Sequence, residues 1–131
     1  MKGFIRAYNA GDLAGAVSQF SHGQALGFSD CDYSTQQLVD GHGRAALVAW
    51  LRRSLADQDR LTIGDIAGSP PDQIGVLGVA FSRRTGDSIA RAGHPSGITP
   101  SSGAKIKFDS VGLITEFNNG PLGGAQDGCR L

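Results

Sequence analysis

The sequence predicts one α+β domain, in which helices come first and a meander of strands follows. Apolar residues recur at helical spacing in the first part of the chain, and a two-residue alternation replaces that spacing from about residue 61 onward. Short turns rich in Gly, Pro and Asp separate the later apolar runs, so consecutive strands are expected to pair antiparallel. The length of 131 residues suits a single domain, 1–131, with a flexible Gly-rich tail from about residue 121.

Three amphipathic helices are expected in the first half of the chain. Phe4 and Tyr8 lie on one helix face, and Gly11 marks the end of that helix because glycine favours a helix C-terminus. Asp12 is expected to cap a second helix, and the segment 41–43 to open a third. The third helix has the clearest apolar stripe, which consists of Ala46, Leu47, Trp50, Leu51 and Leu55.

An extended stretch at 25–33, followed by a polar turn, separates the second helix from the third. Farther along, the apolar runs and turn signals predict strands at 61–67, 74–84, 104–108 and 113–118. Between the second and third of these strands, Asp87 is expected to cap a one-turn helix over 88–92, and a Pro-containing loop follows at 94–103.

The charge balance and the hydropathy argue against several classes of partner. The chain has 12 Lys and Arg against 12 Asp and Glu, so it lacks the basic excess of a nucleic-acid-binding protein. No apolar run approaches the ~20 residues of a membrane span, and the N-terminus lacks the apolar core of a signal peptide. We therefore expect no nucleic-acid or membrane partner and a cytoplasmic protein, secreted only if an N-terminal signal is missing from this chain.

The two cysteines, Cys31 and Cys129, belong to no Cys-x-x-Cys motif and leave two interpretations. The first is one packed thiol and one tail thiol, which a cytoplasmic location favours. The second is a disulfide that ties the tail to the domain, and it requires an oxidising compartment.

Metal and nucleotide signatures give no support for a cofactor. His22, His42 and His94 have no metal-ligand spacing, so no metal site is expected. Residues 41–46, GHGRAA, match the Gly-x-Gly-x-x-Ala dinucleotide fingerprint, which needs a buried strand directly before it. Only two apolar residues precede it and a meander follows, so we expect an ordinary helix start there and no cofactor.

Three segments resemble those of one family. Residues 4–13 (FIRAYNAGDL), 41–46 (GHGRAA) and 107–114 (KFDSVGLI), in this order and spacing, resemble the SnoaL-like polyketide cyclases and ketosteroid isomerases of the nuclear transport factor 2-like superfamily. The resemblance covers about residues 4–119. It implies a cone-shaped α+β barrel, in which a strongly curved, mostly antiparallel sheet is wrapped by three N-terminal helices and a short helix lies between later strands. It also implies a homodimer and an apolar pocket inside the cone.

Seven side chains are expected to line that pocket: Phe4, Phe28, Trp50, Ala104, Ile106, Phe108 and Phe117. Ketosteroid isomerases need a tyrosine, an aspartate base and a protonated aspartic acid in their pocket. Ungapped matching places Phe4, Phe28 and Ala104 at those three positions. None of these side chains can donate or accept a proton, so we expect steroid-enone isomerisation to be absent.

The acidic pair Asp30 and Asp32 is the candidate catalytic site, with Tyr8 as a hydrogen-bond donor to the substrate. If Phe28 faces the pocket, alternation puts both aspartates on the same strand face, with Asp30 nearer the pocket wall, where a carboxylate can act as a general base. In the alternative interpretation the strand ends near Ser29, because Asp is disfavoured inside strands, and both aspartates are solvated turn residues. Tyr8 is then a core tyrosine with one hydrogen bond.

Two further expectations concern surfaces. Asp87, Arg91 and His94 belong to the segment 85–103, which interrupts two strands and carries several glycines, so we expect it to form a lid at the open end of the cone. The strand 74–84 presents apolar residues in both registers, so we expect a second copy of the chain to cover its outer face in a homodimer.

Three functions fit these expectations. The first is an acid–base enzyme without a metal, of the isomerase, cyclase or hydrolase type, acting on a hydrophobic substrate. The second is a non-catalytic binder of a small apolar molecule, and the third is a dimeric interaction domain with no active site. The fold alone does not choose among them. A pocket that holds a buried carboxylate with a hydrogen-bond partner would favour the enzyme.

Overall fold

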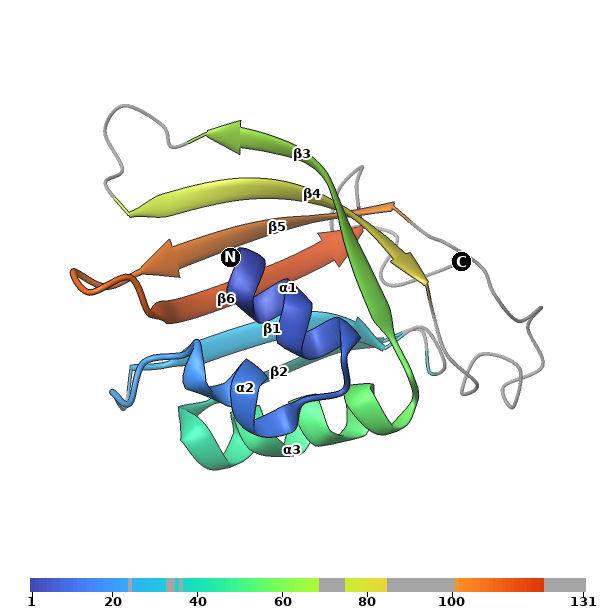
Figure 1. Cartoon of the computed structure of the whole chain (residues 1–131), viewed down its shortest axis with the longest axis horizontal. Helices are drawn as coiled ribbons and strands as arrows, with labels where there is room; N and C mark the ends of the chain where they lie inside the picture. The colour runs from blue at the N-terminus through green and yellow to red at the C-terminus, as the bar shows by residue number, and fades with distance from the viewer. Residues whose placement is uncertain (24, 33–34, 36, 69–74, 85–100, 122–131) are drawn as a thin grey trace.

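The computed structural model of the chain describes residues 1–23, 25–32, 35, 37–68, 75–84 and 101–121. These residues form helices and strands in the predicted α+β class (Figure 1). In chain order the elements are α1 (Lys2–Asn9), α2 (Leu13–Ser18), β1 (Gly27–Asp32), β2 (Gln37–His42), α3 (Gly43–Ala56), β3 (Arg60–Gly68), β4 (Val76–Arg84), β5 (Ser101–Phe108) and β6 (Ile114–Pro121).

The strands form one six-stranded sheet in the order β2-β1-β6-β5-β4-β3. The meander from β3 to β6 pairs antiparallel throughout, as predicted. β1 pairs antiparallel with β2 and parallel with β6, so one parallel contact joins the β1–β2 hairpin to the meander. The described strands at the two ends, β2 and β3, do not pair with each other, so the sheet stays open and the prediction of a barrel is wrong.

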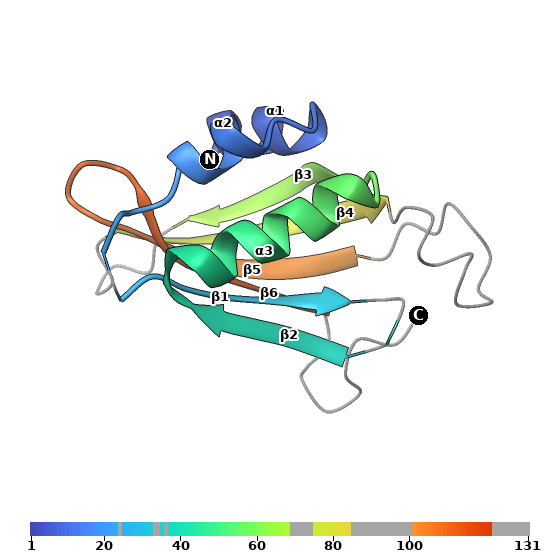
Figure 2. The same ribbon diagram turned by 90° about the horizontal axis from the view of Figure 1, so that it is seen from below.

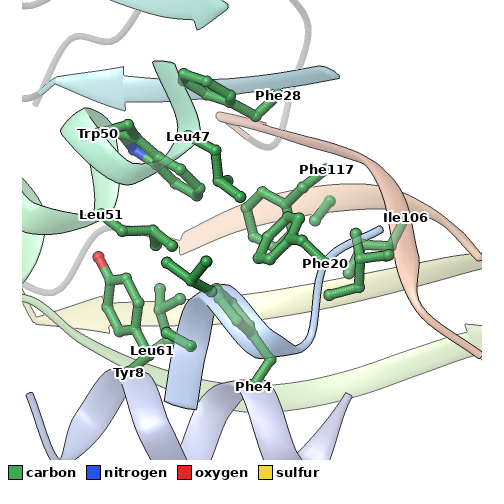
Figure 3. Packing of buried hydrophobic residues seen from close by; sticks show 14 of the residues in the cluster. Phe4, Tyr8, Phe20, Phe28, Leu47, Trp50, Leu51, Leu61, Ile106 and Phe117 are labelled. Atoms are coloured by element: carbon green, nitrogen blue, oxygen red, sulfur yellow. The ribbon is translucent and has the colours of Figure 1, made fainter. Parts of the chain in front are cut away.

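The three helices cover one face of the curved sheet (Figure 2), and the core lies between these two layers. Aromatic rings fill much of it (Figure 3). The ring centroid of Phe4 is 5.4 Å from those of Phe20 and Phe117, and the ring centroid of Trp50 is 5.6 Å from that of Phe117. The predicted stripe of α3 supplies Leu47, Trp50 and Leu51 to this core.

The first helix ends and the second begins where the sequence predicts, although α2 ends at Ser18, before Phe20. After α1 the chain turns at Gly11, whose φ of +72° lies in the left-handed region that glycine tolerates best. Asp12 then caps α2, because its Oδ1 accepts a hydrogen bond of 2.9 Å from the backbone N–H of Gly15. The short turn sets the directions of both helices across the sheet.

Two predicted boundaries are wrong. The expected polar turn before α3 is largely the strand β2, whereas α3 itself begins at Gly43, within the predicted opening at 41–43. β2 was hidden because it is an edge strand in which even Leu38 is exposed, so it lacks an alternating apolar pattern. β5 begins at Ser101, inside the predicted loop. The one-turn helix at 88–92, the lid residues Asp87, Arg91 and His94, and the tail beyond Pro121 lie outside the described residues.

Cys31 is disulfide-bonded, which corrects the interpretation that it is a packed free thiol. The other cysteine of the chain, Cys129, lies outside the described residues. Disulfides persist mainly in oxidising compartments, and the cytoplasmic location that the sequence suggests stays a prediction. Among the described residues, no helix is long and apolar enough to cross a membrane.

Candidate functional site

β1 carries two carboxylates with different surroundings. Phe28 and Asp30 are buried on the face that the helices cover, as alternation predicts, and Asp30 is only 3% exposed. The interpretation that the strand ends near Ser29 is therefore wrong, since β1 continues by pairing with β2 as far as Asp32. Asp32 itself is half-buried at the strand end, where its Oδ1 accepts a hydrogen bond of 3.4 Å from the backbone N–H of Thr35.

Three N–H groups converge on the carboxylate of Asp30. Trp50 Nε1 donates to Oδ2 at 3.2 Å, and Asn119 Nδ2 donates to Oδ1 at 3.0 Å. The backbone N–H of Cys31 also donates to Oδ1, at 2.9 Å. Trp50 comes from α3 and Asn119 from β6, so the carboxylate ties a helix and two strands together.

The position of Asn119 follows from the register of the two parallel strands. The backbone pairing of β1 and β6 runs through Phe28↔Phe117 and ends at Ser29↔Asn118. The next pair along the same register is Asp30 and Asn119, and here the side chains make the contact. Both residues lie on the helix-covered side of the sheet because each is two residues beyond a buried phenylalanine.

This arrangement holds the carboxylate in one orientation beside an apolar wall. Phe28 stacks on Trp50 with ring centroids 4.8 Å apart and an interplanar angle of 12° (Figure 3). A buried polar group is stable only when it is hydrogen-bonded, and the N–H donors supply that condition for Asp30. A carboxylate fixed in this way can accept a proton from a molecule placed against it, which is what general-base chemistry requires.

Tyr8 belongs to a second buried polar group. Its hydroxyl, on a ring that is fully buried on α1, donates to Asp59 Oδ2 at 3.4 Å. Asp59 follows the end of α3 and is also buried. The structure thus joins Tyr8 to Asp59, whereas it joins Asp30 to Trp50 and Asn119.

The residues expected to line a pocket lie in the core. Six of them are buried, and Phe108 packs against the same cluster while remaining partly exposed. Aromatic rings among them contact one another, as those of Phe4 and Trp50 each contact the ring of Phe117. An apolar pocket among these residues stays a prediction.

A pocket of about 290 Å³ lies on the opposite face of the sheet, over β1, β2 and β6. Ser29 and Asn118, which alternate with buried residues of the core face, form part of its wall. The full lining is Ala25, Gly27, Phe28, Ser29, Asp40, His42, Glu116 and Asn118.

A chain of polar contacts borders this outer pocket. Ser29 Oγ donates to Asn118 Oδ1 at 3.0 Å, Asn118 Nδ2 donates to Glu116, and Glu116 pairs with Lys107. The hydrogen bond from Lys107 holds the pKa of Glu116 below its usual value. Within the part of the chain that the structure describes, no three His, Cys, Asp or Glu side chains gather as a metal site.

Three polar groups at these buried sites were not predicted from the sequence. The indole N–H of Trp50 was expected only as part of an apolar wall, and Asp59 follows a helix end without any distinguishing pattern. Asn119 could have been found, because period-two alternation from Phe117 puts it on the core face. A buried Asn at such a position needs a hydrogen-bond partner, and only the pairing of β1 with β6 identifies that partner as Asp30.

No protein-family profile matches the sequence, and no curated protein matches it. Solved structures match it through their fold. The structure of SalBIII, described as an epoxide hydrolase/cyclase-like enzyme in pyran ring formation in the polyether salinomycin, is 14% identical with a TM-score of 0.68, covering 88% of this chain and 82% of that one.

Two further matches come from bacterial proteins. A putative polyketide cyclase from Xanthomonas campestris pv. campestris is 19% identical with a TM-score of 0.61, over 90% of this chain and 84% of that one. An NTF2-like protein of unknown function from Exiguobacterium sp. 255-15 is 13% identical with a TM-score of 0.67, over 94% of this chain and 98% of that one. Since identities this low carry the fold alone, the open curved sheet and its three covering helices identify the chain as a domain of the nuclear transport factor 2-like fold.

Proposed function

We propose that this chain binds a small, largely apolar molecule and carries out acid–base chemistry on it, with Asp30 as the proton acceptor. The observation that best supports this function is the buried Asp30 carboxylate, which accepts hydrogen bonds from Trp50 and Asn119 beside the ring of Phe28. A carboxylate held in one orientation next to a bound substrate can act as a general base, a role that a plain binder does not need. Isomerases, cyclases and hydrolases that work by acid–base catalysis use this kind of proton transfer.

In the proposed reaction, Asp30 takes a proton from the substrate and the electron pair of the broken bond stays on the substrate. The rings of Phe28 and Trp50 hold the apolar body of the molecule. Tyr8 is the proposed donor to the negative charge that develops, and this role requires its hydroxyl to turn from Asp59 toward the substrate. Asp32 has no role in this scheme, because it is the last residue of β1 and its carboxylate accepts a hydrogen bond from the backbone N–H of Thr35 in the turn beyond the strand.

A test of Asp30 as a base uses nitrobenzisoxazole, a small flat molecule with one acidic C–H. A base removes that proton, the N–O bond breaks, and a coloured cyano-nitrophenolate forms. We expect the wild-type protein to accelerate this reaction by about 10²-fold or more over Asp30→Asn, the usual range for a positioned general base. Asp40→Asn is the matched control, because Asp40 is exposed on the outer face of the sheet.

Binding of the probe has its own readout in the same experiment. Trp50 is the only tryptophan of the chain and contacts Asp30, so its fluorescence reports a molecule arriving beside the carboxylate. Circular dichroism checks that Asp30→Asn remains folded. A probe that changes Trp50 emission but reacts equally fast with wild-type and Asp30→Asn protein would show that Asp30 is not a base.

A second function, non-catalytic binding of a small apolar molecule, is supported by the aromatic character of the same region. Phe28, Trp50 and Phe117 offer stacking surfaces that need no chemistry. Under this alternative, Asp30→Asn binds apolar ligands as the wild type does and neither protein turns over the probe.

A further inference from the structure

The two polar atoms of the Asn119 side-chain amide differ in their hydrogen bonding. The side chain is 3% exposed, and its Nδ2 donates to Asp30 Oδ1 at 3.0 Å. Its Oδ1 is also buried, and it has no hydrogen-bond partner among the described residues. A buried amide oxygen in this condition is uncommon in folded proteins and is available to a donor from outside the described residues.

The orientation of this amide is fixed by its neighbour. An Asn side chain can be turned over so that oxygen and nitrogen exchange places, and the hydrogen-bond network decides between the two arrangements. If the Asn119 amide were turned over, its oxygen would face the Asp30 carboxylate, and two acceptors would oppose each other. The N–H group must therefore face Asp30, and the carbonyl oxygen is left as an acceptor beside it.

An unpaired buried acceptor favours the binding of a molecule that brings a donor. Leaving such a group without a partner is more costly than the net gain of an ordinary hydrogen bond, so a matching donor binds with an advantage and a molecule without one does not. Because Asp30 and Asn119 are neighbours, a donor on Oδ1 would place the adjoining atoms of the same molecule beside the carboxylate. Apolar rings of Trp50 and Phe117 lie close by.

We infer that Asn119 determines the substrate class of the proposed acid–base site: an apolar molecule that carries a hydroxyl or N–H group next to the atom from which Asp30 takes a proton. This inference rests on the proposed function. Asn119 acts through recognition, since Oδ1 accepts the substrate's donor, while Nδ2 keeps the carboxylate oriented. The rival occupant of this acceptor is an ordered water molecule.

The test compares alcohols with their own methyl ethers, which have the same apolar body and no donor. Cyclohexanol and adamantanol, each paired with its methyl ether, are titrated into the wild-type protein while Trp50 emission is recorded. We expect each alcohol to bind about tenfold more tightly than its ether, the effect of one satisfied buried hydrogen bond. Asn119→Leu, which has nearly the same shape and no acceptor, should reduce that preference to about one.

The outcomes separate the two proposals. Equal binding of alcohol and ether to the wild-type protein overturns the inference about Asn119. This result is also the one expected if a water molecule occupies the acceptor. The role of Asp30 is then decided by the nitrobenzisoxazole test alone. This comparison needs no variant, so a poorly folded Asn119→Leu protein does not prevent a decision. Failure of every alcohol and every ether to bind would count against both the inference and the proposed function.

Discussion

Trp50 connects the hydrophobic core to the buried carboxylate through one side chain. Its ring stacks on Phe28, and its N–H donates to Asp30. Trp50→Phe keeps much of the ring and removes the donor, so we expect the free energy of unfolding to fall by about 1–3 kcal/mol. Urea denaturation followed by far-ultraviolet circular dichroism measures the change without needing the lost fluorophore.

A double-mutant cycle separates the hydrogen bond from the packing of the ring. If the lost hydrogen bond to Asp30 causes the destabilisation, Trp50→Phe should lower the free energy of unfolding less in an Asp30→Ala background than in the wild type. The same loss in both backgrounds would assign the effect to packing against Phe28 and would contradict this account of Trp50.

Glu116 gives the chain a predictable dependence on pH. The cross-strand Lys107 lowers the pKa of Glu116 in the folded protein, relative to the usual value of 4.5. The stabilisation is therefore present above about pH 4.5 and is lost as the pH falls through the lower folded-state value. Because Lys107 and Glu116 are 43% and 33% exposed, the contribution should not exceed about 1 kcal/mol.

The measurement for this pair is urea unfolding of wild-type and Glu116→Gln protein at neutral pH and at a pH below 4.5. The wild type should be the more stable at neutral pH, and the difference should shrink in acid. A difference that stays constant between the two conditions would mean that the ionisation of Glu116 does not contribute to stability.

At the scale of elements, Gly41 on β2 makes room for the aromatic stack. It lies directly opposite Phe28, and a Cβ at this position would come within 2.8 Å of the Phe28 ring. We expect Gly41→Ala to destabilise the protein by about 1–3 kcal/mol, because the added methyl group presses the ring against Trp50. The emission of Trp50 should shift as its stacking partner moves.

Gly120 on β6 provides the matched control for this substitution. A Cβ added there meets no atom within 4 Å, and Gly120 is not among the glycines with positive φ, so Gly120→Ala should change stability little. Equal effects of the two substitutions would show that the approach of Phe28 to Gly41 is not the cause. Phe28→Leu combined with Gly41→Ala should recover part of the loss, since the smaller side chain leaves space.

Local patterns predicted most elements, whereas pairing between distant strands was only partly predictable. Helical spacing and caps located α1, α2 and most of α3, and turn signals located the meander. β2 was missed because its side chains are largely exposed, so burial leaves no alternation in its sequence. The parallel contact of β1 with β6 depends on a register between segments far apart in the chain, which no local pattern encodes.

In the candidate site, too, features within one strand were predictable and contacts between distant elements were not. Alternation along β1 predicted that Phe28 and Asp30 share the core face, because both belong to one strand. The partners of Asp30 come from α3 and β6, so neither Trp50 Nε1 nor Asn119 could be assigned to it from the sequence. Tyr8 is a buried tyrosine whose hydroxyl donates to Asp59, beyond the end of α3, and its role at the pocket stays a prediction.

At the scale of the whole molecule, a homodimer through the outer sheet face stays a prediction. The structure puts Leu77 and Val79 of β4 in the core, so Val76 and Ala80 belong to the other register. Val76 lies opposite Lys107, so the outer face mixes apolar and charged groups. We expect a dimeric mass at micromolar concentration by analytical ultracentrifugation.

Matched substitutions test which face carries that contact. Ala80→Glu should weaken self-association by about tenfold or more, because it buries an unpaired charge in the interface. Ala45→Glu, on an exposed position of α3, should leave the mass unchanged. A monomeric wild-type protein at micromolar concentration would contradict the prediction outright.

The parallel contact between β1 and β6 also sets the order in which the molecule can assemble during synthesis. Ser29 and Asn118, paired across these strands, are 89 residues apart in the chain. The ribosome therefore releases the β1–β2 hairpin and α3 long before the strand that completes the middle of the sheet, and closing so large a loop is slow. A nascent chain at that stage holds Asp30 without Asn119, so the carboxylate acquires the Asn119 donor only when β6 has been made.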